Sequence, residues 1–264
     1  MFRPEIKRKK SGAPVLSRKQ IDIIGEELVR EFNPNALVTP QEIDIDLFAQ
    51  DYLGMDQDFA YLSHCGVYLG MTVFNDTDKV PVYDPTTNTA DYMSAKAHTV
   101  IIDKTLLADN QEHRYRFTMG HEASHEFLHK EYFVYDPNQL TIFDFMGESP
   151  APMVQCRVDT KKLDAKQQKT WNDRDWMEWQ ANALSSSMLM PESMVRVVVE
   201  DIKTRGIQKG LLHYAFVEEV SSVFNVSFEA ATIRLKQLGY IPTNEQISND
   251  VLNVMMQLQM ASVY

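Results

Sequence analysis

The feature that most constrains the fold of this chain is one histidine-rich segment, residues 120–129, with the sequence GHEASHEFLH. His121, Glu122 and His125 form the pattern His-Glu-x-x-His. Residues 112–130 are predicted to be a helix. Helical residues four apart are offset by about 40° and rise about 6 Å, so both imidazoles project from one face and can reach a single metal ion.

The pattern also predicts chemistry. Zinc lowers the pKa of a bound water to about 7, and Glu122 would take the proton as the water attacks a carbonyl, then return a proton to the leaving amine. His121 and His125 are therefore predicted metal ligands, with one zinc ion per chain. Manganese or cobalt can fill similar sites. The alternative is a polar helix with solvated histidines.

A catalytic zinc needs a third protein ligand. The metzincin pattern would require glycine at position 128 and histidine at position 131, where this chain has Leu128 and Glu131. His129 lies about 12 Å along the helix axis from His121, too far to share the ion. It is expected at the helix end or beside a ligand imidazole.

A carboxylate from a later helix is the other standard solution, and Glu178 offers one. A carboxylate among Trp176, Met177 and Trp179 is costly to bury unless it is paired or bound to metal. Asn182, one turn on, could hydrogen-bond a ligand imidazole. The neighbouring small residues would let this helix pack closely on the motif helix; they are Ala181, Ala183, Ser185, Ser186 and Ser187. The alternative for Glu178 is a solvent-facing charge.

The hydrophobic periodicity and turn residues of the remaining sequence predict an α+β fold with a small antiparallel sheet and an all-α C-terminal part. Thr39, Pro40 and Glu42 indicate a capped helix that would end near Tyr52. Residues 132–170, with three prolines, are predicted to be an irregular loop. The other expected elements are helices at 17–32, 171–189, from Pro191 onward, 207–223, 227–238 and 246–259, and strands at 67–74, 80–83 and 99–102.

Composition excludes some classes of function. The net charge of -11 disfavours nucleic acid as a partner, so DNA binding is not expected. No apolar run reaches the length of about 18 residues needed to span a membrane, and the basic N-terminus lacks a following apolar core. The two cysteines, Cys65 and Cys156, form no disulfide framework. A cytoplasmic location is expected.

Taken together, the two ligand segments resemble the ImmA/IrrE family of zinc metallopeptidases. The resemblance covers roughly residues 15–240 and rests on two elements. The first is His-Glu-x-x-His followed by Leu128-His129, and the second is Glu178-x-Gln180-Ala181-Asn182 leading into Met188-Leu189-Met190-Pro191. Arg116-Phe117-Thr118 and the strand at 99–103 also fit the family pattern. Gln180 departs from it, because many members have a second glutamate at that position.

The resemblance implies a gluzincin-like site, with His121, His125 and Glu178 binding zinc and Glu122 as the catalytic acid–base. It implies a zincin-like domain, placed at 17–190. The basic residues at the start of the chain indicate a flexible arm at 1–16, and a helical, helix-turn-helix-like subdomain is expected at 191–264. Members cleave helix-turn-helix repressors in bacteria and so release genes of mobile elements or stress responses. A cytoplasmic zinc endopeptidase with a role in transcription regulation is therefore expected.

Several alternatives stay open. The chain could be a regulatory binding module with a structural metal site, although a structural site needs no general base. It could be an exopeptidase, although no residue marks a site for a free terminus. Cys156 could occupy the open zinc position as a latch, or be an unreactive cysteine. Residues 226–235 resemble the second helix of a helix-turn-helix, which could read DNA or recognise a repressor of similar shape, or they belong to a simple packing pair of helices. Arg234 could alternatively face the cleft and hold a peptide carbonyl.

Overall fold

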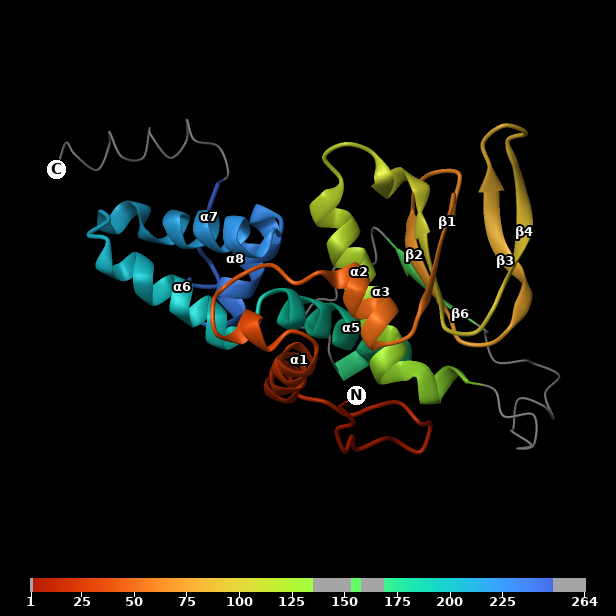
Figure 1. The fold of residues 1–264 in the computed structure, drawn as a ribbon, viewed down its shortest axis with the longest axis horizontal. Coiled ribbons are helices and arrows are strands. Elements are labelled where there is room, and N and C mark those ends of the chain that lie inside the picture. The colour runs from red at the N-terminus through yellow and green to blue at the C-terminus, as the bar shows by residue number, and fades with distance from the viewer. Residues whose placement is uncertain (1, 135–152, 158–168, 249–264) are drawn as a thin grey trace. The chain divides into compact units, whose positions relative to one another are not determined.

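A computed structural model describes residues 2–134, 153–157 and 169–248 of the chain (Figure 1). The chain divides into two compact units. Unit 1 comprises Met1–Ile24 and Asp44–Ser185, and unit 2 comprises Gly25–Ile43 and Ser186–Tyr264. Two helices, α1 (Arg18–Phe32) and α5 (Asp173–Leu189), have residues in both units. The predicted helices at 17–32 and 171–189 are thereby confirmed.

Unit 1 contains a four-stranded sheet in the order β1-β5-β2-β6. Its strands are β1 (Asp56–Ala60), β2 (Tyr68–Val73), β5 (Thr99–Asp103) and β6 (Met153–Arg157). β1 runs parallel to β5, whereas β2 is antiparallel to both β5 and β6. The predicted strands at 67–74 and 99–102 are confirmed as antiparallel neighbours. The sheet as a whole is mixed, because β1 runs parallel to β5, and this corrects the prediction of an antiparallel sheet. The sequence of β1, DQDFA, is polar and lacks the β-branched residues typical of a strand.

Strand β6 also corrects the prediction of an irregular loop at 132–170, because it lies inside that range. Helix α3 (Glu112–Phe133) occupies the first residues of the range. The remainder of the predicted loop, apart from residues 169 and 170, lies outside the described residues.

The second sheet of unit 1 is a hairpin of β3 (Thr77–Asp84) and β4 (Thr89–Ala95). The predicted strand at 80–83 lies inside β3, but it pairs with β4 instead of joining the main sheet. Val80 is fully buried and packs with Met71 and Ile101 of the main sheet. Most of β4 is exposed.

Helix α3 confirms the predicted motif helix and packs against β2 and β5. Helix α5 crosses it closely at Gly120, where an added Cβ would lie 2.6 Å from Ser185 Oγ. Ser185 Oγ also donates a hydrogen bond of 3.2 Å to the carbonyl of Phe117. The small residues of α5 therefore allow the close approach that the sequence predicted, and this approach brings Glu178 to the motif helix.

The helix predicted to start at Thr39 begins later. Residues 40–44 are not helical, and α2 (Ile45–Leu47) continues into a π-helical turn at Phe48–Tyr52. The cap is Asp44, whose carboxylate accepts a hydrogen bond from the Leu47 amide at 3.0 Å. The helix therefore begins at the N-cap formed by Asp44, directly before the buried Ile45, and not at the capping box that Thr39 and Glu42 would have formed.

The basic N-terminal segment, expected as a flexible arm, is part of unit 1. Arg8 forms a β-bridge with Pro14, and its guanidinium donates to the carbonyl of Leu128 at the end of α3, at 3.4 Å. Lys9 forms an ion pair of 2.6 Å with Asp173, the first residue of α5. These contacts, together with the buried side chain of Ala13, order the segment against α3 and α5.

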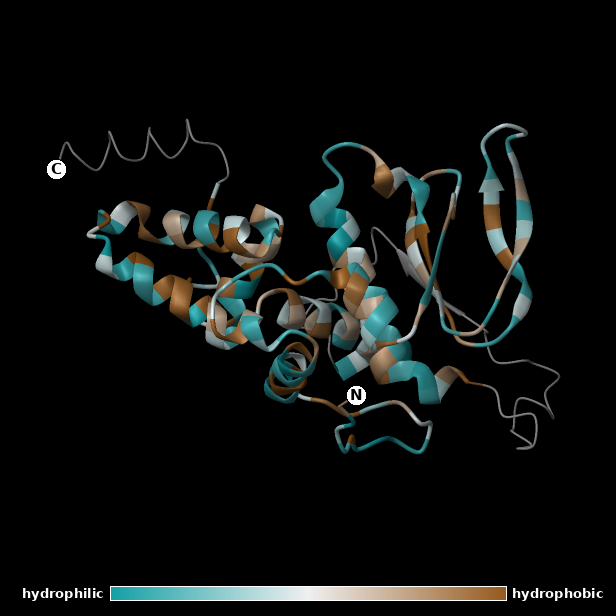
Figure 2. Ribbon diagram, in the orientation of Figure 1, coloured by the Kyte–Doolittle hydropathy of each residue, from teal (hydrophilic) through white to brown (hydrophobic). Residues whose placement is uncertain are grey.

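Unit 2 is helical in the residues described. Its helices include α6 (Glu192–Thr204), α7 (Leu212–Phe224) and α8 (Phe228–Gln237). Hydrophobic and hydrophilic residues alternate along α6 and α7 (Figure 2), as expected for helices that bury one face. Gly239, with φ of +79°, follows α8 and ends it as predicted. The helix predicted at 246–259 lies mostly outside the described residues.

Arg234 does not face a cleft. Its side chain is fully buried in unit 2, and Nε donates a hydrogen bond of 3.0 Å to the carbonyl of Met190. The α7–α8 pair is therefore a packing element at this position. In the described parts of the chain, no helix is long and apolar enough to cross a membrane.

Candidate metal centre

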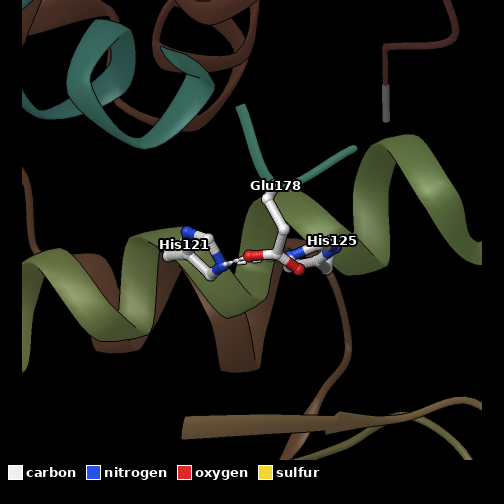
Figure 3. A group of neighbouring side chains, drawn as sticks. All are labelled: His121, His125 and Glu178. Atoms are coloured by element: carbon white, nitrogen blue, oxygen red, sulfur yellow. Dashed lines mark hydrogen bonds and ion pairs between the residues drawn. The ribbon is translucent and has the colours of Figure 1, made fainter. Parts of the chain in front are cut away.

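The structure brings three predicted ligands together in unit 1. One ligand atom from each of His121, His125 and Glu178 lies within 4.8 Å of the others. The two Nε2 atoms are 3.0 Å apart, and the Glu178 oxygens lie 3.3 Å from His121 Nε2 and 3.5 Å from His125 Nε2. Figure 3 shows the carboxylate reaching α3 between the two imidazoles. One metal ion could bind all three groups.

The burial of the three groups is unequal. His121 and His125 are almost fully buried, whereas the side chain of Glu178 remains 21% exposed. Helical spacing sets the histidines one turn apart, with ring centroids 4.7 Å from each other. A site with a partly open carboxylate and buried imidazoles suits a metal that must also meet a substrate.

The outward nitrogen of each imidazole has a polar neighbour. His121 Nδ1 lies 3.0 Å from Asn182 Oδ1, the contact that the sequence predicted. His125 Nδ1 lies 2.9 Å from Nδ1 of His129, which is fully buried. His129 is thus beside a ligand and outside the three-residue cluster, as expected. Such partners orient metal-binding imidazoles.

Glu122 is completely buried beside this cluster. The hydroxyl of Thr72 donates to its Oε2 at 2.6 Å, while Oε1 has no hydrogen-bond partner among the described residues. Leaving a buried carboxylate oxygen unpaired costs about 1–3 kcal/mol or more. This cost, next to three converging ligand atoms, fits a site built to receive a metal and its water.

The pKa shifts of these side chains also agree with a metal site. Burial raises the pKa of Glu122 to about 7, although His121 and the Thr72 hydrogen bond oppose the shift. Burial lowers the pKa of His125, against the influence of Glu178. For Glu178, burial acts to raise the pKa, but the two imidazoles, chiefly His125, outweigh burial and lower it. A neutral imidazole and an ionised carboxylate are the forms that bind metal.

Two neighbours of Glu122 were not found from the sequence. An added Cβ at Gly70 would lie 2.7 Å from Glu122 Oε1 and 2.8 Å from Thr118 Cγ2, so only glycine fits beside the carboxylate. Thr72 reaches Glu122 from the same strand, β2. A glycine inside a strand pattern is a signal for a close approach, and it could have pointed to Gly70. Nothing local marks Thr72.

The backbone of Cys156 is in β6, in register with Gly70 of β2. Its side chain lies outside what the structure describes, so the latch stays a hypothesis. Its test is simple: unchanged basal activity and zinc affinity in Cys156→Ser would exclude the latch.

Two imidazoles and a glutamate converging beside a second, buried glutamate form the set of ligands and base that metallohydrolases use. The family model Peptidase_M78, described as the IrrE N-terminal-like domain, matches residues 158–236. This match confirms the family resemblance and supports a peptidase. The matched range includes Glu178 and Asn182 and excludes the His-Glu-x-x-His segment. No curated protein matches the chain.

Proposed function

We propose that this chain is a zinc-dependent endopeptidase that hydrolyses a peptide bond in a protein, with a helix-turn-helix transcriptional repressor as its substrate. The observation that carries the proposal is the convergence of His121, His125 and Glu178 beside the unpaired Oε1 of Glu122. A structural site would have no use for a buried glutamate held next to the ligands.

In this proposal the metal is held by His121 Nε2, His125 Nε2 and the Glu178 carboxylate. Bound zinc supplies a Lewis acid that lowers the pKa of water and polarises a carbonyl. Glu122 accepts a proton at Oε1, its free oxygen, while Thr72 holds Oε2. A pKa of about 7 in the metal-free protein places Glu122 close to the range where a group can both take and return a proton.

The substrate class rests on the family resemblance. Members of the ImmA/IrrE family cleave helix-turn-helix repressors, and the Peptidase_M78 match supports the resemblance. We therefore propose an anti-repressor role, for a mobile element or a stress response, in the bacterial cytoplasm. The alternative is a non-catalytic regulatory module with a structural metal site.

The test uses purified protein loaded with zinc and the helix-turn-helix proteins encoded beside its gene. Cleavage is followed by electrophoresis, and the new termini are read by mass spectrometry. Wild type should cut one such protein at a defined bond, and Glu122→Gln should bind it without cutting. Binding without cleavage by the zinc-loaded wild type would favour the regulatory module.

A further inference from the structure

Behind the metal centre, a line of buried polar groups runs from His125 to the N-terminal segment. His125 Nδ1 lies 2.9 Å from His129 Nδ1, and His129 Nε2 lies 3.0 Å from Gln180 Oε1. Gln180 Nε2 then donates a 3.0 Å hydrogen bond to the carbonyl of Pro14. His125, His129, Gln180 and Pro14 are all buried.

The carbonyl at the end of this line fixes the direction of every hydrogen bond in it. A carbonyl only accepts, so the amide nitrogen of Gln180 must face Pro14, and its oxygen must face His129. His129 therefore carries a proton on Nε2, and in its neutral form it accepts at Nδ1. His125 must then donate from Nδ1, which leaves the lone pair of its Nε2 directed at the metal centre.

The opposite order would disable the site. If His129 donated from Nδ1, a neutral His125 would accept at Nδ1 and carry its proton on Nε2. That proton would stand at the position of the metal bond, 3.0 Å from His121 Nε2. Metal binding requires an unprotonated ring nitrogen.

We propose that His129 and Gln180 are positioning residues for the metal centre. The Pro14 carbonyl fixes the orientation of the Gln180 amide, the amide oxygen fixes which nitrogen of His129 carries a proton, and His129 thereby holds His125 in its metal-binding tautomer. The ordered N-terminal segment thereby completes the metal centre. The contacts of Arg8 with Leu128 and of Lys9 with Asp173 keep that carbonyl in place. The inference rests on the proposed function only in requiring that the site binds metal.

The direct test is the tautomer of each imidazole in the metal-free full-length protein, where no bound zinc imposes it. Long-range ¹H–¹⁵N spectra separate Nδ1–H from Nε2–H, and single histidine substitutions assign the seven histidines. The expected result is a proton on Nδ1 of His125 and on Nε2 of His129. A proton on Nδ1 of His129 would overturn the proposal.

Zinc affinity gives a second test, measured by competition with a chromophoric chelator. Gln180→Leu removes the acceptor and should weaken zinc binding about 10–100-fold. Gln180→Glu keeps an acceptor for His129 and, as a protonated carboxyl, can still donate to the Pro14 carbonyl, so it should bind zinc more tightly than Gln180→Leu. Equal affinity in wild type and Gln180→Leu, or equal losses in both variants, would contradict the proposal.

The matched control is Ser185→Ala, which removes another hydrogen bond between α5 and α3 without touching a ligand. Its zinc affinity should equal that of wild type, and the thermal midpoints of the metal-free proteins report any general loss of folding. If the wild type binds no zinc, the proposed function itself is contradicted. If the wild type binds zinc and Gln180→Leu binds it equally well, only this inference is contradicted.

Discussion

The hydroxyl of Thr72 donates a 2.6 Å hydrogen bond to Glu122 Oε2, linking β2 to α3 across 50 residues of sequence. Both residues are fully buried. This bond fixes one oxygen of the proposed base, and the other oxygen has no hydrogen-bond partner among the described residues. The Thr72 hydrogen bond thus holds Oε2 of Glu122 in place and leaves Oε1 to exchange a proton.

Thr72→Val should therefore impair catalysis without removing metal. Losing one hydrogen bond to the base should lower kcat/KM about tenfold. Because the Thr72 bond lowers the pKa of Glu122, the acidic limb of the kcat/KM profile should move to higher pH. Thr72→Ser keeps the hydroxyl and serves as the control. A Thr72→Val profile that overlays wild type would show that the bond does not act on the base.

Gly70→Ala should displace Glu122. The added Cβ would meet Glu122 Oε1 at 2.7 Å and Glu122 Cγ at 2.9 Å, closer than real contacts allow. Overpacking of this kind costs about 1–3 kcal/mol of stability, and cleavage should fall more than tenfold. Gly210→Ala is the control, because an added Cβ there meets nothing within 4 Å. Full activity in Gly70→Ala, measured beside chemical unfolding, would contradict the tight fit.

The stability of the metal-free protein should depend on pH because Glu122 titrates differently in the folded and unfolded states. Its pKa is raised by burial from 4.5 to about 7, so the folded state holds a proton that the unfolded state releases. The stability from this group is complete below pH 4.5 and is lost as pH rises through about 7. Relative to Glu122→Gln, wild type should therefore lose up to about 3 kcal/mol between pH 4.5 and 8.

Urea unfolding in the presence of a chelator, at a series of pH values, measures this difference. Taking the difference between the two proteins cancels the titration of groups that they share. A constant difference across the range would mean that Glu122 keeps an ordinary pKa in the fold.

The sequence predicted the parts of the site that are local. The spacing of His121 and His125 alone predicts one helix face, and α3 places both imidazoles there. Glu178 was predicted from the cost of burying its charge and from the family resemblance. The first argument uses only the neighbours of Glu178 on the same helix, Trp176, Met177 and Trp179, and the second uses the family pattern.

The contacts between distant segments could not be predicted. Thr72, Gly70 and Pro14 reach the site from other elements, and pairing over such separations depends on how the sheet and segments pack. The same reason explains the missed strand β1, whose polar residues Asp56, Gln57 and Asp58 form a strand because β5 offers a partner. Tertiary context there overrides weak strand propensity.

The most direct test of the central claim is the metal content of three purified proteins, measured by mass spectrometry. The account predicts about one zinc per chain in wild type, strong depletion in Glu178→Gln, and retention in Glu122→Gln. That pattern would separate the third ligand from the base. Full zinc in Glu178→Gln would mean that another group completes the site, and no metal in any of the three would contradict the metallopeptidase account.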